Sequence, residues 1–304
     1  MNRIEIRELT KDYGRTRVVD HLTFDVLPGR VTGFLGPNGA GKTTTMRLLL
    51  GLARPTAGTA TLGGRRFTDL REPLRHVGAL LDPQAPYGGR TARDHLLILA
   101  AGNGIPEGRV GTVLEQCGIT PVARRRIKTF SLGMRQRLGI AAALLGDPRV
   151  LLLDEPTNGL DPEGILWIRE LMRRLAGEGR TVLVSSHLMA ETASFADHLV
   201  VLGQGRLLVD TPTAEFIDAH SSPRVRLRTS DPDRLLTALA RRGRELVPAE
   251  DGRWTVDGIR AEAVGALAAG EGIPVLELSD ERASLEQAYL ALTAGRADFS
   301  AKAA

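Results

Sequence analysis

Residues 36–44, Gly-Pro-Asn-Gly-Ala-Gly-Lys-Thr-Thr, have the residue types and spacing of a polyphosphate-binding loop. Gly36, Gly41, Lys42 and Thr43 fit the pattern G-x-x-x-x-G-K-[ST]. Glycines let successive backbone N–H groups converge on one anion, and a helix beginning at Lys42 would add the partial positive charge of its N-terminus. Lys42 would reach the outer phosphates, and the Thr43 hydroxyl would hold Mg²⁺. We therefore predict a nucleoside triphosphate site.

Two carboxylates follow a second apolar segment. Val150–Leu153 is a continuous apolar run, typical of a parallel strand buried on both faces, and Asp154 and Glu155 come directly after it. Asp154 would hold Mg²⁺ through water, and Glu155 would take the proton from a water that attacks the γ-phosphate. Two acids after a strand can also simply face solvent. Beside the phosphate loop, a hydrolytic role is favoured.

A histidine ends the next apolar run. Thr181–Ser185 reads as a buried strand, and Ser186 and His187 follow it. The carboxyl ends of parallel strands meet at one edge of a sheet, where ligands bind in open α/β folds. A histidine at this place is more often structural or a helix cap. Its expected position beside the γ-phosphate favours a catalytic role for His187.

The elements that must position these residues alternate between strand and helix. Apolar periodicity predicts strands at 4–9, 18–26, 31–35, 78–81, 150–153, 181–185, 200–202 and 206–209, and helices at 44–50, within 90–145 and at 163–175. Such alternation predicts an α/β fold with a mostly parallel core sheet.

The sequence changes character after the segment Ala219–Pro223, which we expect to be a linker. The predicted domains are therefore 1–220 and 221–304, the second a small α+β accessory domain. Its expected strands are 224–229, 254–256 and 275–278, and its expected helices are 233–241 and 260–269. Ser284-Leu285-Glu286-Gln287 has the pattern of a capping box and would open a last helix, before a frayed tail.

Composition limits the classes of partner. The net charge of +4 is small, and the densest basic cluster, Arg124–Arg126, has no interleaved aromatic residues, so it indicates a solvated face and no nucleic acid is expected. Only four of the 40 Lys and Arg residues are lysines, which is typical of a GC-rich bacterial genome. The single cysteine, Cys117, excludes an internal disulfide and a cysteine metal cluster, and we expect it to be a small buried residue.

The sequence also limits the location of the chain. No apolar stretch approaches the roughly 20 residues of a membrane span, and the first residues lack the apolar core of a signal peptide. We expect a cytoplasmic protein whose membrane role, if it has one, comes through a partner.

In this order, the motifs resemble those of the nucleotide-binding subunit of ABC transporters, over about residues 1–220. Residues 36–44 match Walker A, and Leu151–Glu155 match Walker B. Phe130–Arg137 lies where this family has its LSGGQ signature, and Pro156–Pro162 looks like its D-loop. His187 is similar to the switch histidine of the family. The resemblance implies a P-loop ABC-type ATPase domain, with a mostly parallel core sheet, an antiparallel β subdomain and a helical subdomain.

The resemblance also implies that two copies of the chain sandwich ATP. The phosphate loop of one copy would face Ser131 and Gly133 of the other, although both residues also fit an ordinary helix cap. Tyr13 falls where the family places an aromatic ring against adenine. The expected nucleotide contacts within one copy are Tyr13, Gly36, Pro37, Asn38, Gly39, Ala40, Gly41, Lys42, Thr43 and Thr44.

Two segments depart from the family pattern. Leu132 and Met134 replace a signature glycine and glutamine. At the Q-loop, Asp82 stands at the expected register and Gln84 comes two residues later, so either could be the residue that reaches Mg²⁺. Asp82 could instead only begin the turn at Pro83. The family contacts its membrane partner at this loop.

These variants resemble the branch that exports drugs and antibiotics, including bacitracin-type and daunorubicin-type resistance ATPases. We expect an ATPase that uses ATP and Mg²⁺ to drive a separate membrane permease, held at the inner face of the membrane by that permease. One alternative is a soluble ABC ATPase that acts on ribosomes or DNA, but its usual second nucleotide domain, long coiled coil or zinc motif is not seen. Another is a regulatory module without turnover, which the presence of Lys42 and Glu155 disfavours.

Overall fold

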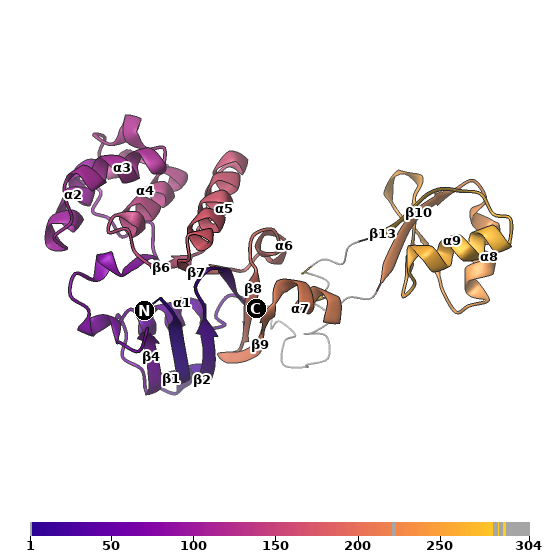
Figure 1. Ribbon diagram of the computed structural model, residues 1–304, viewed down its shortest axis with the longest axis horizontal. Helices are drawn as coiled ribbons and strands as arrows, with labels where there is room; N and C mark the ends of the chain where they lie inside the picture. Colours follow the sequence, from indigo (N-terminus) through magenta and orange to yellow (C-terminus); the bar gives the residue numbers. More distant parts are fainter. Residues whose placement is uncertain (1, 221–222, 282–284, 286–287, 290–304) are drawn as a thin grey trace. The chain divides into compact units, whose positions relative to one another are not determined.

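The computed structural model describes residues 2–220, 223–281, 285, 288 and 289 of the 304-residue chain. The chain divides into two compact units, Met1–Thr213 and Ala214–Ala304 (Figure 1). None of the helices in the described ranges combines the length and the apolar content that a bilayer crossing needs.

A six-stranded sheet forms the centre of the first unit, in the order β5-β6-β7-β3-β8-β9. Its strands are β3 (Val31–Leu35), β5 (Val77–Leu80), β6 (Val150–Asp154), β7 (Thr181–Ser186), β8 (His198–Gly203) and β9 (Arg206–Pro212). All pairings are parallel except that of β8 with β9, which confirms the predicted mostly parallel core. Every residue of β3, β6, β7 and β8 is buried, as expected for strands covered on both faces.

The register of these strands brings the predicted site residues to one edge of the sheet. Leu35 pairs with Ser186, and Asp154 pairs with Ser185, so β3, β6 and β7 end at the same level. The phosphate loop, the carboxylate pair and His187 follow these three strand ends. The parallel sheet therefore brings the phosphate loop together with two segments that lie more than 100 residues further along the chain.

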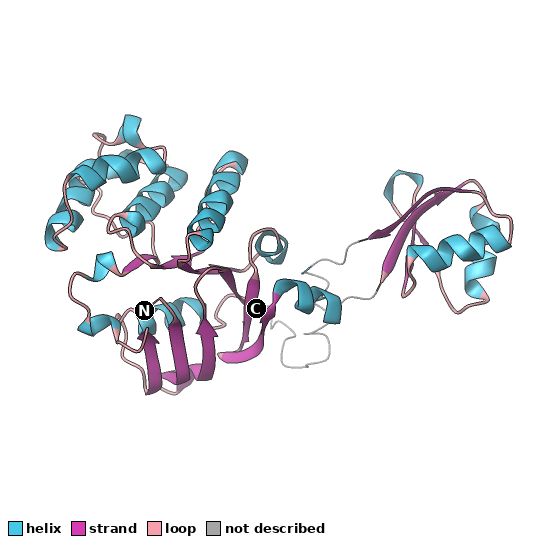
Figure 2. Cartoon of the chain, viewed as in Figure 1, coloured by secondary structure: helices cyan, strands magenta, loops and turns pink. Residues whose placement is uncertain are grey.

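Helices connect the strands and cover the sheet. They are α1 (Lys42–Leu49), α2 (Ala92–Gly102), α3 (Gly108–Gln116), α4 (Leu132–Leu144), α5 (Pro162–Gly177) and the short α6 (Met189–Ala193). Figures 1 and 2 show α2, α3, α4 and α5 on one side of β6 and β7, and α1 on the other. Asp161 begins α5 as its N-cap, because its carboxylate accepts from the backbone N–H of Gly164.

A three-stranded antiparallel sheet, in the order β2-β1-β4, completes the first unit. Its strands are β1 (Ile4–Tyr13), β2 (Thr16–Val26) and β4 (Ala57–Leu62). One buried cluster joins this sheet to α1 and to the core sheet, through residues such as Ile4, Met46 and Leu152. Helix α1 therefore packs between two sheets. This packing fixes its position, so that its N-terminus can face a phosphate.

The second unit contains a four-stranded antiparallel sheet, in the order β11-β12-β10-β13. Its elements are β10 (Arg224–Thr229), α8 (Pro232–Ala240), β11 (Leu246–Pro248), β12 (Trp254–Asp257), α9 (Ala261–Gly270) and β13 (Val275–Glu281). This βαββαβ order and strand arrangement is ferredoxin-like. Val225, Leu235 and Val264 belong to its buried core. The predicted capping box at Ser284-Leu285-Glu286-Gln287 lies outside the described residues, apart from Leu285.

The first two residues of the predicted linker at Ala219–Pro223 are helical. Ala219 and His220 belong to α7 (Thr213–His220). The segment Thr-Ala-Glu-Phe-Ile-Asp-Ala-His contains no Gly or Pro, and Glu215 lies in the first turn, where a negative charge favours a helix. The compact units divide at Thr213/Ala214, before most of α7, and the predicted domain boundary at 220/221 stays a prediction.

Candidate functional site

The phosphate loop curls around a pocket of about 190 Å³ at the carboxyl edge of the core sheet. The loop leaves β3 after Leu35 and enters α1 at Lys42. Gly41 is the N-cap of α1 and has a φ of +100°, and a Cβ added there would lie 2.7 Å from the carbonyl oxygen of Val18. Only glycine fits this place. The pocket is lined by Val18, Asn38, Gly39, Ala40, Gly41, Lys42, Thr43, Thr44 and Glu155.

Positive charge dominates the phosphate-loop side of this pocket. The first turn of α1 carries no acidic side chain, and Gly41 offers none to cap it, so the N-terminal partial charge of the helix is available to an anion. The Lys42 ammonium is buried and donates to the carbonyls of Gly36 (2.6 Å) and Pro37 (3.2 Å). Burial lowers the pKa of Lys42, whereas Glu155 and Asp154 oppose this change. A bound phosphate would offer the Lys42 ammonium charged oxygens in place of these carbonyl oxygens.

Two oxygen donors meet between the loop and β6. The Thr43 hydroxyl donates to the Asp154 carboxylate over 2.6 Å. A hydroxyl, a carboxylate and substrate phosphates are the ligands that Mg²⁺ prefers, and it needs few protein side chains. The described residues contain no group of three or more His, Cys, Asp or Glu side chains that could hold a metal ion. The donor set fits Mg²⁺.

Glu155 and His187 form the pair at the catalytic end. The Nδ1 atom of His187 lies 2.8 Å from Oε2 of Glu155, and Glu155 also lines the phosphate-loop pocket. Glu155 has a φ of +49°, a left-handed conformation that is unusual for a residue with a side chain. Such strain persists only where surrounding contacts impose it, and it is frequent at active sites.

Ser185 contacts both acidic residues, the carboxylate of Asp154 and the backbone of Glu155, a role that sequence reasoning missed. Its buried hydroxyl donates to Asp154 and accepts from the backbone N–H of Glu155 over 2.9 Å. The signal that could have found it is a serine in place of an apolar residue near the end of a buried strand.

The expected signature residues begin α4. Ser131 is its N-cap, because its Oγ accepts from the backbone N–H of Met134 over 3.2 Å, and Ser131 remains exposed. Gly133 lies against the loop after β6, where an added Cβ would be 2.7 Å from the carbonyl oxygen of Gly159. The helix-cap interpretation thus holds within one copy of the chain, and the contact with a second copy's ATP stays a prediction.

Tyr13, Asp82 and Gln84 are among the predicted residues that do not line the pocket. Tyr13 is 50% exposed at the end of β1, with the Lys11 ammonium 4.8 Å from its ring centre. Oδ1 of Asp82 accepts from the backbone N–H of Gln84 over 2.8 Å, which is the turn-forming role left open for Asp82. In the described part of the chain, no hydrogen bond joins Asp82 or Gln84 to Thr43 or Asp154. Their choice as a Mg²⁺ residue stays a prediction.

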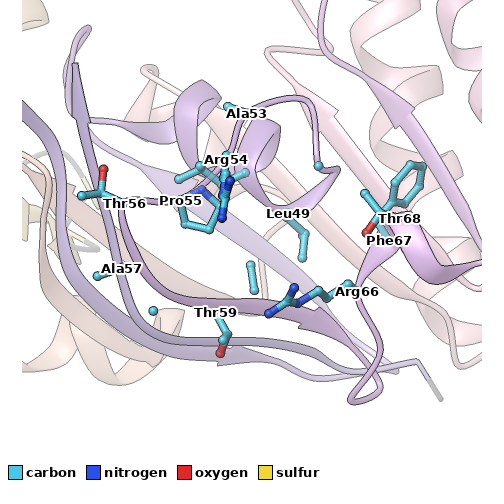
Figure 3. A pocket seen from close by; sticks show the side chains of 14 residues that line it. Leu49, Ala53, Arg54, Pro55, Thr56, Ala57, Thr59, Arg66, Phe67 and Thr68 are labelled. Atoms are coloured by element: carbon cyan, nitrogen blue, oxygen red, sulfur yellow. The ribbon is translucent and has the colours of Figure 1, made fainter. Parts of the chain in front are cut away.

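A larger pocket of about 360 Å³ lies elsewhere, between the C-terminal end of α1 and β4 (Figure 3). Leu49 and Phe67 contribute apolar surface, and Arg54 and Arg66 line it together with small residues. It shares no lining residue with the phosphate-loop pocket and contains no carboxylate. The residues with hydrolytic chemistry are therefore gathered at the carboxyl edge of the core sheet.

Comparison with known families gives two matches. The profile of the family described as ABC transporter matches residues 19–158. A family described as Domain of unknown function (DUF8746) matches residues 223–286. The first match contains the phosphate loop, the segment at Ser131 and the carboxylate pair, and the second falls on the four-stranded sheet and its helices.

Curated relatives extend the first match. The chain is 45% identical over 212 residues to the bacitracin transport ATP-binding protein BcrA of Bacillus licheniformis, covering 69% of each chain. It is 36% identical over 207 residues to the lantibiotic transport ATP-binding protein SrtF of Streptococcus pyogenes, covering 68% of this chain and 90% of the relative.

Solved structures agree in fold. An ATP-binding subunit of an ABC transporter superposes with a TM-score of 0.66 at 28% identity, covering 71% of this chain and 92% of that one. A dimeric bacterial ABC transporter cassette gives a TM-score of 0.64 at 23% identity, covering 69% and 98%, which concerns the fold alone. These likenesses confirm the predicted P-loop ABC-type α/β fold.

Proposed function

The chain belongs to the family of ABC transporter ATP-binding proteins and is an ATPase subunit, and we propose that it hydrolyses MgATP to drive a separate permease exporting an antibiotic-like, amphipathic compound. The observation that carries the hydrolytic part is the position of Glu155. Glu155 lines the phosphate-loop pocket together with Lys42, and its Oε2 lies 2.8 Å from Nδ1 of His187. The names of the bacitracin and lantibiotic relatives support the class of cargo.

The residues divide the hydrolytic work among them. Lys42 and the N-terminus of α1 would bind the β- and γ-phosphates and stabilise the charge that develops on them. Thr43 and Asp154 would hold Mg²⁺, which when bound would neutralise charge on the phosphate oxygens. Glu155 would accept the proton of the attacking water. His187 would orient the Glu155 carboxylate and bind near the γ-phosphate through its other ring nitrogen.

The site of one copy is open on one side, and we propose that a second copy closes it. Ser131 caps α4 and is exposed, so its hydroxyl and the first N–H groups of that helix would complete the cage around the γ-phosphate of the other copy. A similar solved structure is described as dimeric, which supports this arrangement. The permease would hold the pair at the inner face of the membrane.

The test expresses the chain from a genome fragment that also contains its neighbouring membrane-protein genes. Bacitracin and a lantibiotic serve as probes, and the matched variant is Glu155→Gln. We expect the wild-type chain, but not the variant, to raise the inhibitory concentration of at least one probe and to co-purify with a multi-span protein. Equal resistance of both strains, or recovery of the chain on ribosomes instead of membranes, would overturn the export proposal.

A further inference from the structure

The backbone of Glu155 is held on both sides by side chains from other elements. Its N–H donates to Oγ of Ser185 on β7 over 2.9 Å, and its carbonyl oxygen accepts from Nε2 of Gln136 on α4 over 3.1 Å. Glu155 has the left-handed φ of +49° between these two contacts. A residue with a side chain adopts this conformation only when its surroundings impose it. These two hydrogen bonds, together with one from the Asn158 N–H to the same carbonyl over 3.2 Å, therefore restrain the backbone that carries the carboxylate.

The contact with Glu155 buries the other polar atom of the Gln136 amide without a hydrogen-bond partner among the described residues. Its side chain is 1% exposed, and its Oε1 atom has no hydrogen-bond partner within the described part of the chain. An apolar side chain of the same length would fill this place without burying an unpaired oxygen. Packing alone therefore does not explain the amide, whereas its bond to the Glu155 carbonyl does.

The position of Gln136 on α4 connects two sites. Ser131 caps α4 and is the residue expected to contact the ATP held by the second copy. Gln136 comes five residues later, about 7.5 Å further along the helix axis. If α4 shifts when Ser131 contacts that ATP, the shift would therefore reach the backbone of Glu155, whose carboxylate acts on the ATP of its own copy.

We propose that Gln136 is a positioning residue that fixes Glu155 and couples the two ATP sites of the dimer through α4. This inference rests on the proposed function. Gln136 itself does not touch the nucleotide. Its loss leaves ATP binding by the phosphate loop in place, but removes the α4 donor to the Glu155 carbonyl, which keeps the bond from the Asn158 N–H, and uncouples the Glu155 carboxylate from the occupancy of the neighbouring site.

The experiment compares Gln136→Met, which keeps the length but removes the donor, with Arg109→Met. Arg109 on α3 also holds α4 through a backbone carbonyl, that of Leu144, over 3.0 Å, but at the far end of the helix. Three quantities are measured on the full chain: the rate of ATP hydrolysis against ATP concentration, the Kd for ATP and the melting temperature. Gln136→Asn, which keeps the amide but is too short to reach, repeats the test if Gln136→Met does not fold.

We expect Gln136→Met to lower kcat about tenfold to a hundredfold, as loss of one buried hydrogen bond at a catalytic residue can. Its Kd for ATP should stay within about threefold, and the Hill coefficient for ATP should fall towards one. Arg109→Met should lower the melting temperature and leave kcat and the Hill coefficient unchanged. If Gln136 only stabilised the fold, kcat would fall together with the melting temperature in both variants. That result would overturn the inference, and so would a wild-type kcat in Gln136→Met.

The Glu155→Gln variant separates this inference from the proposed function. If Glu155→Gln keeps wild-type turnover, the catalytic assignment itself fails. If Glu155→Gln stops hydrolysis while Gln136→Met keeps both its rate and its cooperativity, only the positioning role of Gln136 fails.

Discussion

The hydroxyl of Thr43 donates to the carboxylate of Asp154 over 2.6 Å, which joins two residues 111 positions apart in the chain. One stands at the N-terminus of α1 and the other at the end of β6. The contact exists because β3 and β6 end at the same edge of the core sheet. It brings together two oxygen donors of the kind that Mg²⁺ prefers, next to the phosphate loop.

Replacing Asp154 should therefore change the dependence on Mg²⁺. Asp154→Asn keeps the shape but removes the negative charge, so we expect half-maximal activation to need at least about tenfold more Mg²⁺ and kcat to fall. The measurement is ATP hydrolysis titrated with MgCl₂, with Asp257→Asn in the second unit as the control. An unchanged Mg²⁺ midpoint in Asp154→Asn would remove Asp154 from the metal site.

His187 should matter for turnover and not for nucleotide affinity. His187→Ala removes the ring that holds Oε2 of Glu155, and we expect kcat to fall about a hundredfold with little change in the Kd for ATP. The matched control is His21→Ala, because His21 makes a similar contact with Asp20 over 2.7 Å, is exposed and does not line the pocket. Equal kcat values for the two variants would contradict a catalytic role for His187.

The two glycines of the phosphate loop should respond differently to alanine. Both Gly39 (φ +83°) and Gly41 (φ +100°) are left-handed, but a Cβ at Gly39 meets open space, whereas one at Gly41 lies 2.7 Å from the carbonyl oxygen of Val18. We expect Gly39→Ala to cost about 1 kcal/mol of unfolding free energy. Gly41→Ala should cost clearly more and abolish ATP binding. Urea denaturation measures the loss of unfolding free energy in both variants. Equal losses would show that the loop moves to relieve the close contact at Gly41.

The sequence predicted those parts of the site that lie within one short segment. The phosphate loop could be recognised because Gly36 to Thr43 form a local pattern, and Asp154 because a buried strand precedes it. The contacts of Ser185 and Gln136 with Glu155 were missed, since they join residues 30 and 19 positions apart and depend on how β7 and α4 pack. β4 was missed because Ala57, Gly58 and Ala60 give it no apolar alternation.

The roles of two further residues could not be assigned from the sequence, for different reasons. The turn at Asp82 depends on a local hydrogen bond to the Gln84 backbone, which competes with any role at the metal and cannot be ranked against it from residue types alone. Ser131 has a complete role within its own chain as the cap of α4, so its contact with a second copy is not determined by the structure of one copy.

Cys117 should report on unfolding. The thiol is fully buried, and burial raises its pKa to about 12 from an ordinary 9.0. A thiol-specific reagent should therefore label the native protein far more slowly than the unfolded one, because the thiolate is the reactive form. Between pH 9 and 12 the unfolded chain loses this proton while the folded chain keeps it, so folding stability falls as pH rises through that window. Cys117→Ala should lessen this fall, and rapid labelling of native protein would contradict the burial.

The most direct test of the account is the hydrolysis of ATP by Glu155→Gln. This change keeps the size of the side chain and removes the proton acceptor, so we expect turnover to fall at least about a hundredfold. ATP binding should persist, because Lys42 and the phosphate loop are intact, and size-exclusion chromatography in ATP should show an accumulating dimer. Hydrolysis at the wild-type rate by Glu155→Gln would contradict the catalytic site described for this chain.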